Sequence, residues 1–399
     1  MTALATATPT LAERTARVVG VLAEHARAVD DSATFPVASL DALRESGLMG
    51  LLVPVEHGGL GGDLADLART AADLGGACLS TAMIWAMHGQ QVAAIAAHAG
   101  PRLRADLLPR IARGEVYVAS VTSERGKGGH LLTAEAPLRP DGDRLGIDRD
   151  APIVTGGAVA DGFLITMRAS PDAGYDDVSL VYADRGQVTA EPGRGSWNPM
   201  GMRGTHSVPL RITGDVPADQ LVGEPGGFRA VATRTFVPAG HIGWAACWLG
   251  AARGALSSVL GMIRDPRTRG SFDPTSELLR RRLARARLDL DTVAALLAQA
   301  IRDAADARDV SAAEAPDVQL RLNGLKVHAA ERCAAVVDEL VELTGLRHGY
   351  MRDSALPLER VHRDLRSASL NYANDRLYDA NGAIALLDRT VTLAWAGRP

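Results

Sequence analysis

The 399-residue sequence contains few aromatic residues and few cysteines. Aromatic residues make up only 4% of the chain, so the cores must rely on alanine, leucine and valine, a composition that favours helices. The three cysteines, Cys78, Cys247 and Cys333, are widely spaced and lie in apolar stretches. Because their number is odd and their spacing matches no disulfide framework or metal site, we interpret them as buried thiols.

Charged residues of one sign do not gather in long runs, and the net charge is −4. Proteins that bind nucleic acid normally carry a basic face, so this class of function is not expected. Residues 1–14 lack the basic and apolar segments of a secretory signal. The longest apolar run, residues 242–263, is interrupted by Arg253 and contains four glycines, which is more typical of a buried core helix than of a membrane span. We therefore expect a soluble, cytoplasmic protein with no nucleic-acid or membrane partner and no resident metal.

The hydrophobic pattern changes twice along the chain and predicts an α+β protein of three domains behind a flexible tail over residues 1–10. Residues 11–115 show apolar positions at three- and four-residue spacing, which is typical of helices. Residues 116–222 contain short β-type runs between glycine, proline and aspartate turns, which predicts a small antiparallel barrel or sandwich. Residues 223–399 return to the helical pattern and predict an antiparallel four-helix bundle. We expect its helices at about 226–263, 275–308, 315–345 and 357–388.

Several short segments, each rich in glycine or in charged residues, follow one another in a definite order. They are LVPVEHGGLGG (52–62), VTSERGKGGH (121–130), NPMGMRGTHS (198–207) and LPLERVHRDLRSASLNY (356–372). In this order they resemble segments of the acyl-CoA dehydrogenase family, over nearly the whole chain from about residue 11. The resemblance implies the fold of that family, with an N-terminal helical domain, a central β-barrel or sandwich and a C-terminal four-helix bundle. It also implies an FAD cofactor, a small-molecule substrate that is an acyl thioester, and assembly into a homotetramer or a dimer.

The resemblance places cofactor-binding residues in the first half of the chain. In relatives, the loop that starts at residue 121 covers the flavin and its pyrophosphate, so Thr122, Ser123, Gly128 and Gly129 are candidates. Hydroxyl donors and glycine amides suit close approach to phosphate. Thr155 matches the threonine whose hydroxyl bonds flavin N5 in the family; the alternative is an ordinary threonine at a strand end.

Further cofactor residues are implied in the second half of the chain. Arg269 and Phe272 retain the Arg-x-x-Phe arrangement in which, in relatives, the arginine reaches the FAD pyrophosphate across a subunit interface. A guanidinium suits bidentate phosphate binding, although an exposed arginine at a helix end is the plain alternative. Gly345 lies in a segment that resembles the family's glycine turn near FAD.

The catalytic base of the family is missing from its usual positions. In most members a glutamate follows the Arg363-Asp364 pair by eight residues, and this position holds Tyr372. In other members the glutamate lies on an earlier helix just before an arginine. Here Gly240 and His241 occupy those two positions.

Other side chains near these positions are candidates for the missing role. Tyr372 is at the right place, but the pKa of an ordinary tyrosine is near 10. His241 titrates near neutrality. Asp375 follows Tyr372 by three residues and would project to the same side of a helix. Each of the three has the alternative role of forming a wall of the pocket.

Different functions therefore remain open. One is an FAD-dependent dehydrogenase that desaturates an acyl thioester, on CoA or an acyl carrier protein, with a non-standard base and an electron-transfer protein as acceptor. Another is a flavin-dependent monooxygenase of the same fold, which would use O₂ and reduced flavin from a flavin reductase and would not need the glutamate. The remaining one is a non-catalytic paralogue, against which the presence of Thr155 argues.

Overall fold

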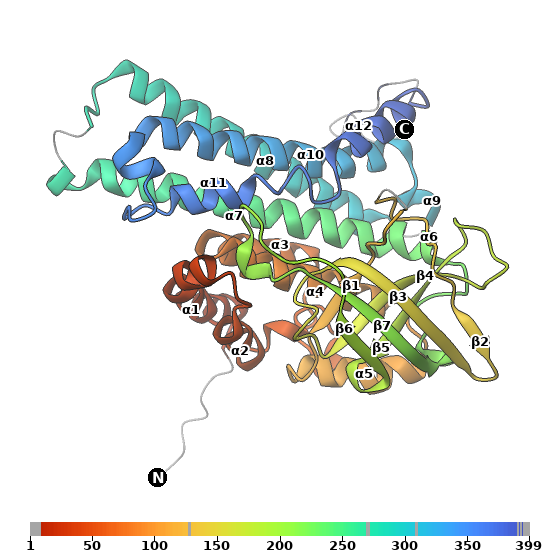
Figure 1. Cartoon of the computed structure of the whole chain (residues 1–399). Helices are drawn as coiled ribbons and strands as arrows, with labels where there is room; N and C mark the ends of the chain where they lie inside the picture. The colour runs from red at the N-terminus through yellow and green to blue at the C-terminus, as the bar shows by residue number, and fades with distance from the viewer. Residues whose placement is uncertain are drawn as a thin grey trace, which may run out of the picture.

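The computed structural model describes residues 9–126, 129–268, 272–307, 310–388, 391 and 393. Long C-terminal helices lie along one side of the molecule, and the N-terminal helices and the β-domain lie against the other side of this bundle (Figure 1). A single buried cluster contains residues of all three parts, among them Leu22, Phe163, Ala245 and Leu365. The predicted order of a helical, a β and a second helical domain is confirmed.

The N-terminal domain consists of helices with clear start signals. Thr10 caps the first of them: its side chain accepts from the amide of Glu13, and the Glu13 carboxylate accepts from the amide of Thr10. Asp63 and Asp66 form the same reciprocal cap at the start of the third. The helices are α1 (Leu11–Ser32), α2 (Val37–Glu45), α3 (Leu64–Ala77), α4 (Leu79–His98) and α5 (Pro101–Ala112).

The central domain contains two sheets, with strand orders β1-β4-β5 and β2-β3-β7-β6. The expectation of a purely antiparallel domain is wrong at one pair, because β1 runs parallel to β4. Between these two strands the chain passes through the other sheet, so it re-enters the first sheet in the same direction. The strands are β1 (Val118–Val121), β2 (Arg139–Asp141), β3 (Arg144–Val154), β4 (Gly162–Arg168), β5 (Val178–Asp184), β6 (Val188–Pro192) and β7 (Val208–Pro217).

The C-terminal domain is a bundle of long helices that pack side by side (Figure 1). The cysteines predicted to be buried thiols, one of which lies in α3–α4 and two in this bundle, are free and buried. A π-helical turn over Ala232–Phe236 leads into the first long helix. The helices are α6 (Phe228–Val231), α7 (Val237–Arg264), α8 (Glu277–Asp306), α9 (Val310–Ala313), α10 (Pro316–Gly345), α11 (Leu358–Leu365) and α12 (Asn374–Ala385).

The continuous helix expected over 357–388 is wrong. α11 ends at Leu365, and a turn of eight residues, 366–373, separates it from α12. Tyr372 adopts the left-handed conformation in this turn, with φ +56°. The side chain of Lys326, from α10, holds two carbonyls of the turn, which the helical pattern of the sequence does not reveal.

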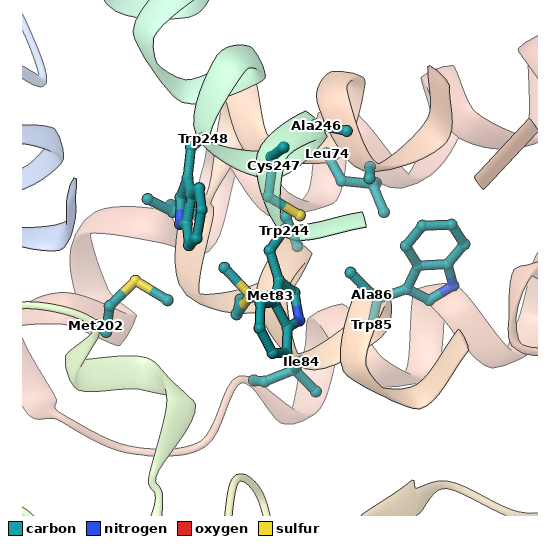
Figure 2. Packing of buried hydrophobic residues seen from close by; sticks show 14 of the residues in the cluster. Leu74, Met83, Ile84, Trp85, Ala86, Met202, Trp244, Ala246, Cys247 and Trp248 are labelled. Carbon is teal, nitrogen blue, oxygen red and sulfur yellow. The ribbon is translucent and has the colours of Figure 1, made fainter. Parts of the chain in front are cut away.

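Within the described residues, the helix Phe228–Arg264 is long and apolar enough to cross a membrane, by length and composition only. In the structure α7 packs against α3, α4, α8 and α10. Its Trp244 and Trp248 lie among Met83, Ile84 and Met202, whereas Trp85 points away from them (Figure 2). The hydropathy of this helix is therefore accounted for by its place in the protein core, as the sequence predicts.

The Arg363-Asp364 pair joins three parts of the fold. The guanidinium of Arg363 binds both carboxylate oxygens of Asp30 on α1, at 2.6 and 3.0 Å, and the carbonyl of Met200 at 3.0 Å. The carboxylate of Asp364 accepts the backbone amide of Met202. The pair thus fastens α11 to α1 and to the segment before β7, which positions the turn that follows α11.

Asp364 makes the stability of the protein depend on pH. Burial raises the pKa of this carboxyl to about 7, although the Met202 amide and Arg360 lower it. The pKa of Asp364 in the folded protein lies above that of an exposed aspartate, so protonated Asp364 stabilises the folded state. This stabilisation is complete below about pH 4 and is lost as the pH rises through 7. We expect the urea midpoint to fall between pH 5 and pH 8 in the native protein. In Asp364→Asn, whose side chain cannot ionise, the urea midpoint should change less with pH. An equal change in both proteins would show that Asp364 does not titrate in this range.

Candidate functional site

Polar and aromatic side chains gather where α4, α7, α10 and the turn over residues 366–373 meet. Gly240 of α7 faces α4, because a Cβ atom at this glycine would lie 2.3 Å from Nε2 of Gln90. One residue further on, the ring of His241 lies 6.3 Å from the ring of Tyr372, centroid to centroid. Lys326 reaches the same turn from α10. The structure therefore brings Gly240, His241 and Tyr372 together.

His241 is a buried imidazole with a weakened basicity. Only 3% of the residue is exposed, and its ring also lies 5.8 Å from that of Trp244. Burial lowers the pKa of His241 to about 3; the charge of Lys326 acts in the same direction, and a hydrogen bond with the backbone of Leu322 opposes them. The ring is therefore neutral at physiological pH. Within the described part of the chain, its Nδ1 atom has no hydrogen-bond partner.

Tyr372 lies at the edge of this cluster as a neutral phenol. Burial raises the pKa of Tyr372, although Arg376 lowers it. Asp375 is exposed and lies in the first turn of α12, after the helix break. The argument that Asp375 shares one side of a helix with Tyr372 is therefore wrong, because no continuous helix joins them. Catalytic roles for Tyr372, His241 and Asp375 stay predictions.

Gln90 is a residue of this site that the sequence analysis missed. Its side-chain amide donates to the carbonyl of Phe236 at 2.7 Å, and its Oε1 atom accepts from Gln91 at 3.2 Å. It thereby fills the space in front of Gly240. A side chain at position 240 would displace it. The signal in the sequence was a pair of glutamines inside an otherwise apolar helix, α4.

Buried polar atoms without a hydrogen-bond partner accompany this cluster. Among the described residues they include Oε1 of Gln91, Nδ1 of His241 and Nε1 of Trp244. Buried polar groups are normally paired, so exceptions call for an explanation such as a missing ligand. These three atoms supply an acceptor, a ring nitrogen and a donor. A small molecule with complementary carbonyl and N–H or O–H groups would satisfy them.

Thr155 follows the end of β3 and belongs to a buried chain of hydroxyl groups. Its Oγ1 lies 3.0 Å from Oγ of Ser207, which lies 2.8 Å from Oγ1 of Thr205. Thr205 must donate to the carbonyl of Met202, at 2.9 Å, because a carbonyl only accepts. Ser207 therefore donates to Thr205, and Thr155 donates to Ser207. The hydroxyl of Thr155 is left as an acceptor towards any further partner.

The loop after β1 is held between the β-domain and α12. Ser123 donates its hydroxyl to the carbonyl of Ile153 at 2.7 Å, and Thr122 beside it is half-buried. Gly129, with φ +80°, lies next to α12: a Cβ there would come within 3.9 Å of Nε of Arg376. Gly128 lies outside the described residues. The structure thus places Thr122, Ser123 and Gly129 in one loop beside the strand that leads to Thr155.

Phe272 and Gly345 lie elsewhere in the chain. Gly345 ends α10 and has φ +67°. His348 follows it by three residues, and its ring lies 6.2 Å from the ring of Phe272, centroid to centroid. Both belong to the connections at the end of the bundle that lies away from the β-domain (Figure 1). Arg269 lies outside the described residues. A site that contains Thr155, Phe272 and Gly345 would therefore need a second copy of the chain.

The sequence and structure resemble those of known proteins. Residues 11–115 match the family model of the acyl-CoA dehydrogenase N-terminal domain, and residues 242–389 match that of the C-terminal domain. The chain is 28% identical over 353 residues to cyclohex-1-ene-1-carbonyl-CoA dehydrogenase of Syntrophus aciditrophicus (strain SB), covering 88% of this chain and 81% of the relative. It is 25% identical over 342 residues to the short-chain specific acyl-CoA dehydrogenase of Clostridium acetobutylicum, covering 85% and 86%.

Solved structures of similar shape include enzymes of two kinds. FMN-bound TdsC from Paenibacillus sp. A11-2, a protein that another structure names as a dibenzothiophene monooxygenase, has a TM-score of 0.82 and 22% identity, and the match covers 95% of this chain and 98% of TdsC. Butyryl-CoA dehydrogenase from Megasphaera elsdenii has a TM-score of 0.82 and 19% identity, with 97% and 100% covered. At these identities the likeness shows the shared fold and does not choose between the two activities.

Proposed function

The chain belongs to the acyl-CoA dehydrogenase family and is a flavin-dependent oxidoreductase, and we propose that within this family it acts as a monooxygenase on a small molecule. One observation carries this proposal. Relatives supply the carboxylate base from one of two positions, and both carry neutral groups here. The side-chain amide of Gln90 lies against Gly240, and position 372 holds the phenol of Tyr372.

Dehydrogenation beside a thioester needs a base of suitable strength. The base takes the α-proton while a hydride leaves the neighbouring carbon, and its pKa should lie near the working pH. The pKa of about 3 makes His241 too weak, and the raised pKa of Tyr372 keeps its phenol protonated. Oxygenation has no such requirement. Two electrons from reduced flavin and two protons reduce O₂, one oxygen atom enters the substrate, and the other leaves as water.

The residues of the β-domain fit a flavin. A bound flavin supplies the two-electron chemistry. Thr122, Ser123 and Gly129 would hold it from the loop after β1, and Thr155 would meet its ring. Because the Thr155 hydroxyl can only accept there, it suits an N–H group, which reduced flavin presents at N5, better than a bare ring nitrogen. A preference for reduced flavin is the property that a monooxygenase supplied by a flavin reductase requires.

Replacing Ser207 by alanine should weaken this preference. The change frees the proton of Thr155, so that the hydroxyl is able to donate to oxidised flavin as well. We expect the ratio of the Kd for oxidised flavin to the Kd for reduced flavin to fall by about fivefold to tenfold, the equivalent of about 1 kcal/mol for one hydrogen bond. Anaerobic titration with FAD and FMN in both redox states measures it. The control is Ser179→Ala, which changes a buried serine in β5. An unchanged ratio of the two Kd values in Ser207→Ala would contradict the order of donors derived for Thr155, Ser207 and Thr205.

The proposed function is tested by separating oxygen from reduced flavin. The protein is mixed anaerobically with butyryl-CoA and with cyclohex-1-ene-1-carbonyl-CoA, and in parallel with indole and dibenzothiophene plus reduced flavin and ¹⁸O₂. We expect no bleaching of bound flavin by either thioester, and incorporation of one ¹⁸O atom into an aromatic substrate. Bleaching by a thioester without O₂ would overturn the monooxygenase proposal.

A dehydrogenase is the second candidate, because the curated relatives at 24–28% identity are named as acyl-CoA dehydrogenases. In this function Tyr372 or His241 would act as the base on an acyl thioester, carried by CoA or by an acyl carrier protein, and an electron-transfer protein would accept the electrons. A solved structure of similar shape is the prolyl acyl carrier protein oxidase AnaB, with a TM-score of 0.78.

The bundle presents apolar side chains that suit assembly of several copies. Leu278 and Leu288 on α8 are 62% and 68% exposed, and Leu346 after α10 is 74% exposed. Such exposed apolar side chains would be stabilised if a second copy of the chain covered them. We propose a homotetramer or a dimer, in which a second copy brings Phe272 and Gly345 to the flavin of the first. Light scattering after size-exclusion chromatography tests it, and a monomeric mass would contradict it.

A further inference from the structure

Lys326 is a lysine without exposed surface in the middle of α10. Its Nζ atom donates to the carbonyl of Ala368 at 3.0 Å, to the carbonyl of Tyr372 at 2.8 Å and to Oδ1 of Asn374 at 2.8 Å. An ammonium group has three hydrogens, and each finds one oxygen. Burying a charge is costly unless it is fully hydrogen-bonded, so this match explains how the lysine is accommodated.

The oxygens that Lys326 binds all belong to the break between α11 and α12. Two are backbone carbonyls of the turn over residues 366–373, and the third is the side chain of the first residue of α12. Buried carbonyls need partners once a helix is interrupted. Tyr372 also adopts φ +56° there, a conformation that is unfavourable for a residue with a side chain. The ammonium supplies contacts that offset this cost.

We propose that Lys326 is a positioning residue whose Nζ atom holds the turn over residues 366–373 and thereby presents Tyr372 to His241. The inference deepens the proposed function, on which it rests in assigning Tyr372 to the active site. Lys326 acts through the backbone carbonyl of Tyr372, whose ring lies beside that of His241.

The groups around Lys326 make the arrangement sensitive to pH. Burial lowers the pKa of Lys326 to about 7, and the carboxylate of Glu331, one turn further along α10, raises it. From α7 it faces the ring of Trp248, at 5.6 Å, and His241, whose ring is neutral. From the turn it faces Tyr372, whose phenol is protonated. Because the closed turn lowers the pKa of Lys326, it binds this proton less tightly than an open turn that exposes the lysine, so the closed turn should become more stable as the pH rises through 7.

Hydrogen exchange of the full-length protein, followed by mass spectrometry without substrate, tests this inference independently of any turnover. After correction for intrinsic rates, we expect the protection of residues 366–374 to rise by about tenfold between pH 6 and pH 9, while that of α1 stays constant. Lys326→Met should lose this protection at both pH values. Protection of the turn in Lys326→Met equal to that of the native protein would overturn the proposal.

A second variant keeps the test decisive should Lys326→Met not fold. Glu331 is exposed, and Glu331→Gln retains an acceptor for Asn374 while removing the charge that raises the pKa of Lys326. Its pH response should therefore shift to lower pH by several tenths of a unit. Glu342→Gln, an exposed change at the far end of α10, is the matched control and should shift nothing. If the protection of residues 366–374 changed at the same pH midpoint in Glu331→Gln and in the control, Lys326 would not be the titrating group and the proposal would be overturned.

Discussion

Replacing Glu124 by glutamine is expected to lower the free energy of unfolding by about 3–5 kcal/mol. Glu124 forms a buried ion pair with Arg149, whose side chain has no exposed surface. It also accepts the backbone amides of Glu135 and Ala136, at 2.9 and 2.8 Å. Burial raises the pKa of Glu124, but Arg149 and the two amides outweigh it and lower the pKa. Glutamine would leave the charge of Arg149 buried without its paired carboxylate and would turn an NH₂ group towards an amide donor.

Urea denaturation at neutral pH measures this loss. The matched control is Asp148→Asn, which removes the exposed pair of Asp148 with Arg211 in the same domain. Exposed pairs contribute at most about 1 kcal/mol, so the control should change little. A loss below about 1 kcal/mol in Glu124→Gln would show that the pair is not desolvated in solution. Because Glu124 lies in the loop that carries Thr122 and Ser123, the variant should also bind flavin more weakly.

Replacing Tyr372 by glutamate is expected to give the largest change in activity. If a carboxylate at this position is what the chain lacks, Tyr372→Glu should bleach bound flavin with butyryl-CoA anaerobically. A positioned general base contributes roughly 10²–10⁴-fold, so the rate should exceed that of the native protein by at least about 10²-fold. The ammonium of Lys326, which already binds the carbonyl of this residue at 2.8 Å, favours a carboxylate nearby.

Tyr372→Gln is the control for this experiment, because it has the size of glutamate but cannot take a proton. Equal rates in the glutamate and glutamine variants would mean that position 372 does not face the α-carbon of a thioester. A native protein that already reacts as fast as Tyr372→Glu would instead favour the dehydrogenase candidate, with the phenol as base.

The sequence was sufficient for the architecture and for the family. The order of helical, β and helical patterns predicted the order of the domains, and short segments such as the one with the Arg363-Asp364 pair indicated the family. Both depend on periodicity and short motifs, which are local properties of a chain. The resemblance to the family named Gly240, His241 and Tyr372 as positions of interest, and the structure places them close together, while their catalytic roles stay predictions.

Tertiary contacts decided what the sequence could not. The helical pattern continues through residues 366–373, yet the helix breaks there, and Lys326, some forty residues earlier, binds carbonyls of the turn. Gln90 lies 150 residues from Gly240 and enters the site only through the packing of α4 on α7. The parallel pairing of β1 with β4 depends in the same way on the path of the chain through the other sheet.

The family, the domain order and the loss of the usual carboxylate at positions 240 and 372 can be read from the sequence. The chemical state of the groups that remain depends on the folded protein. The weak basicity of His241, the protonated phenol of Tyr372 and the acceptor role of Thr155 follow from burial and from hydrogen bonds between distant segments. A pKa or a donor order depends on the surroundings of a side chain, and those surroundings exist only once the chain has folded.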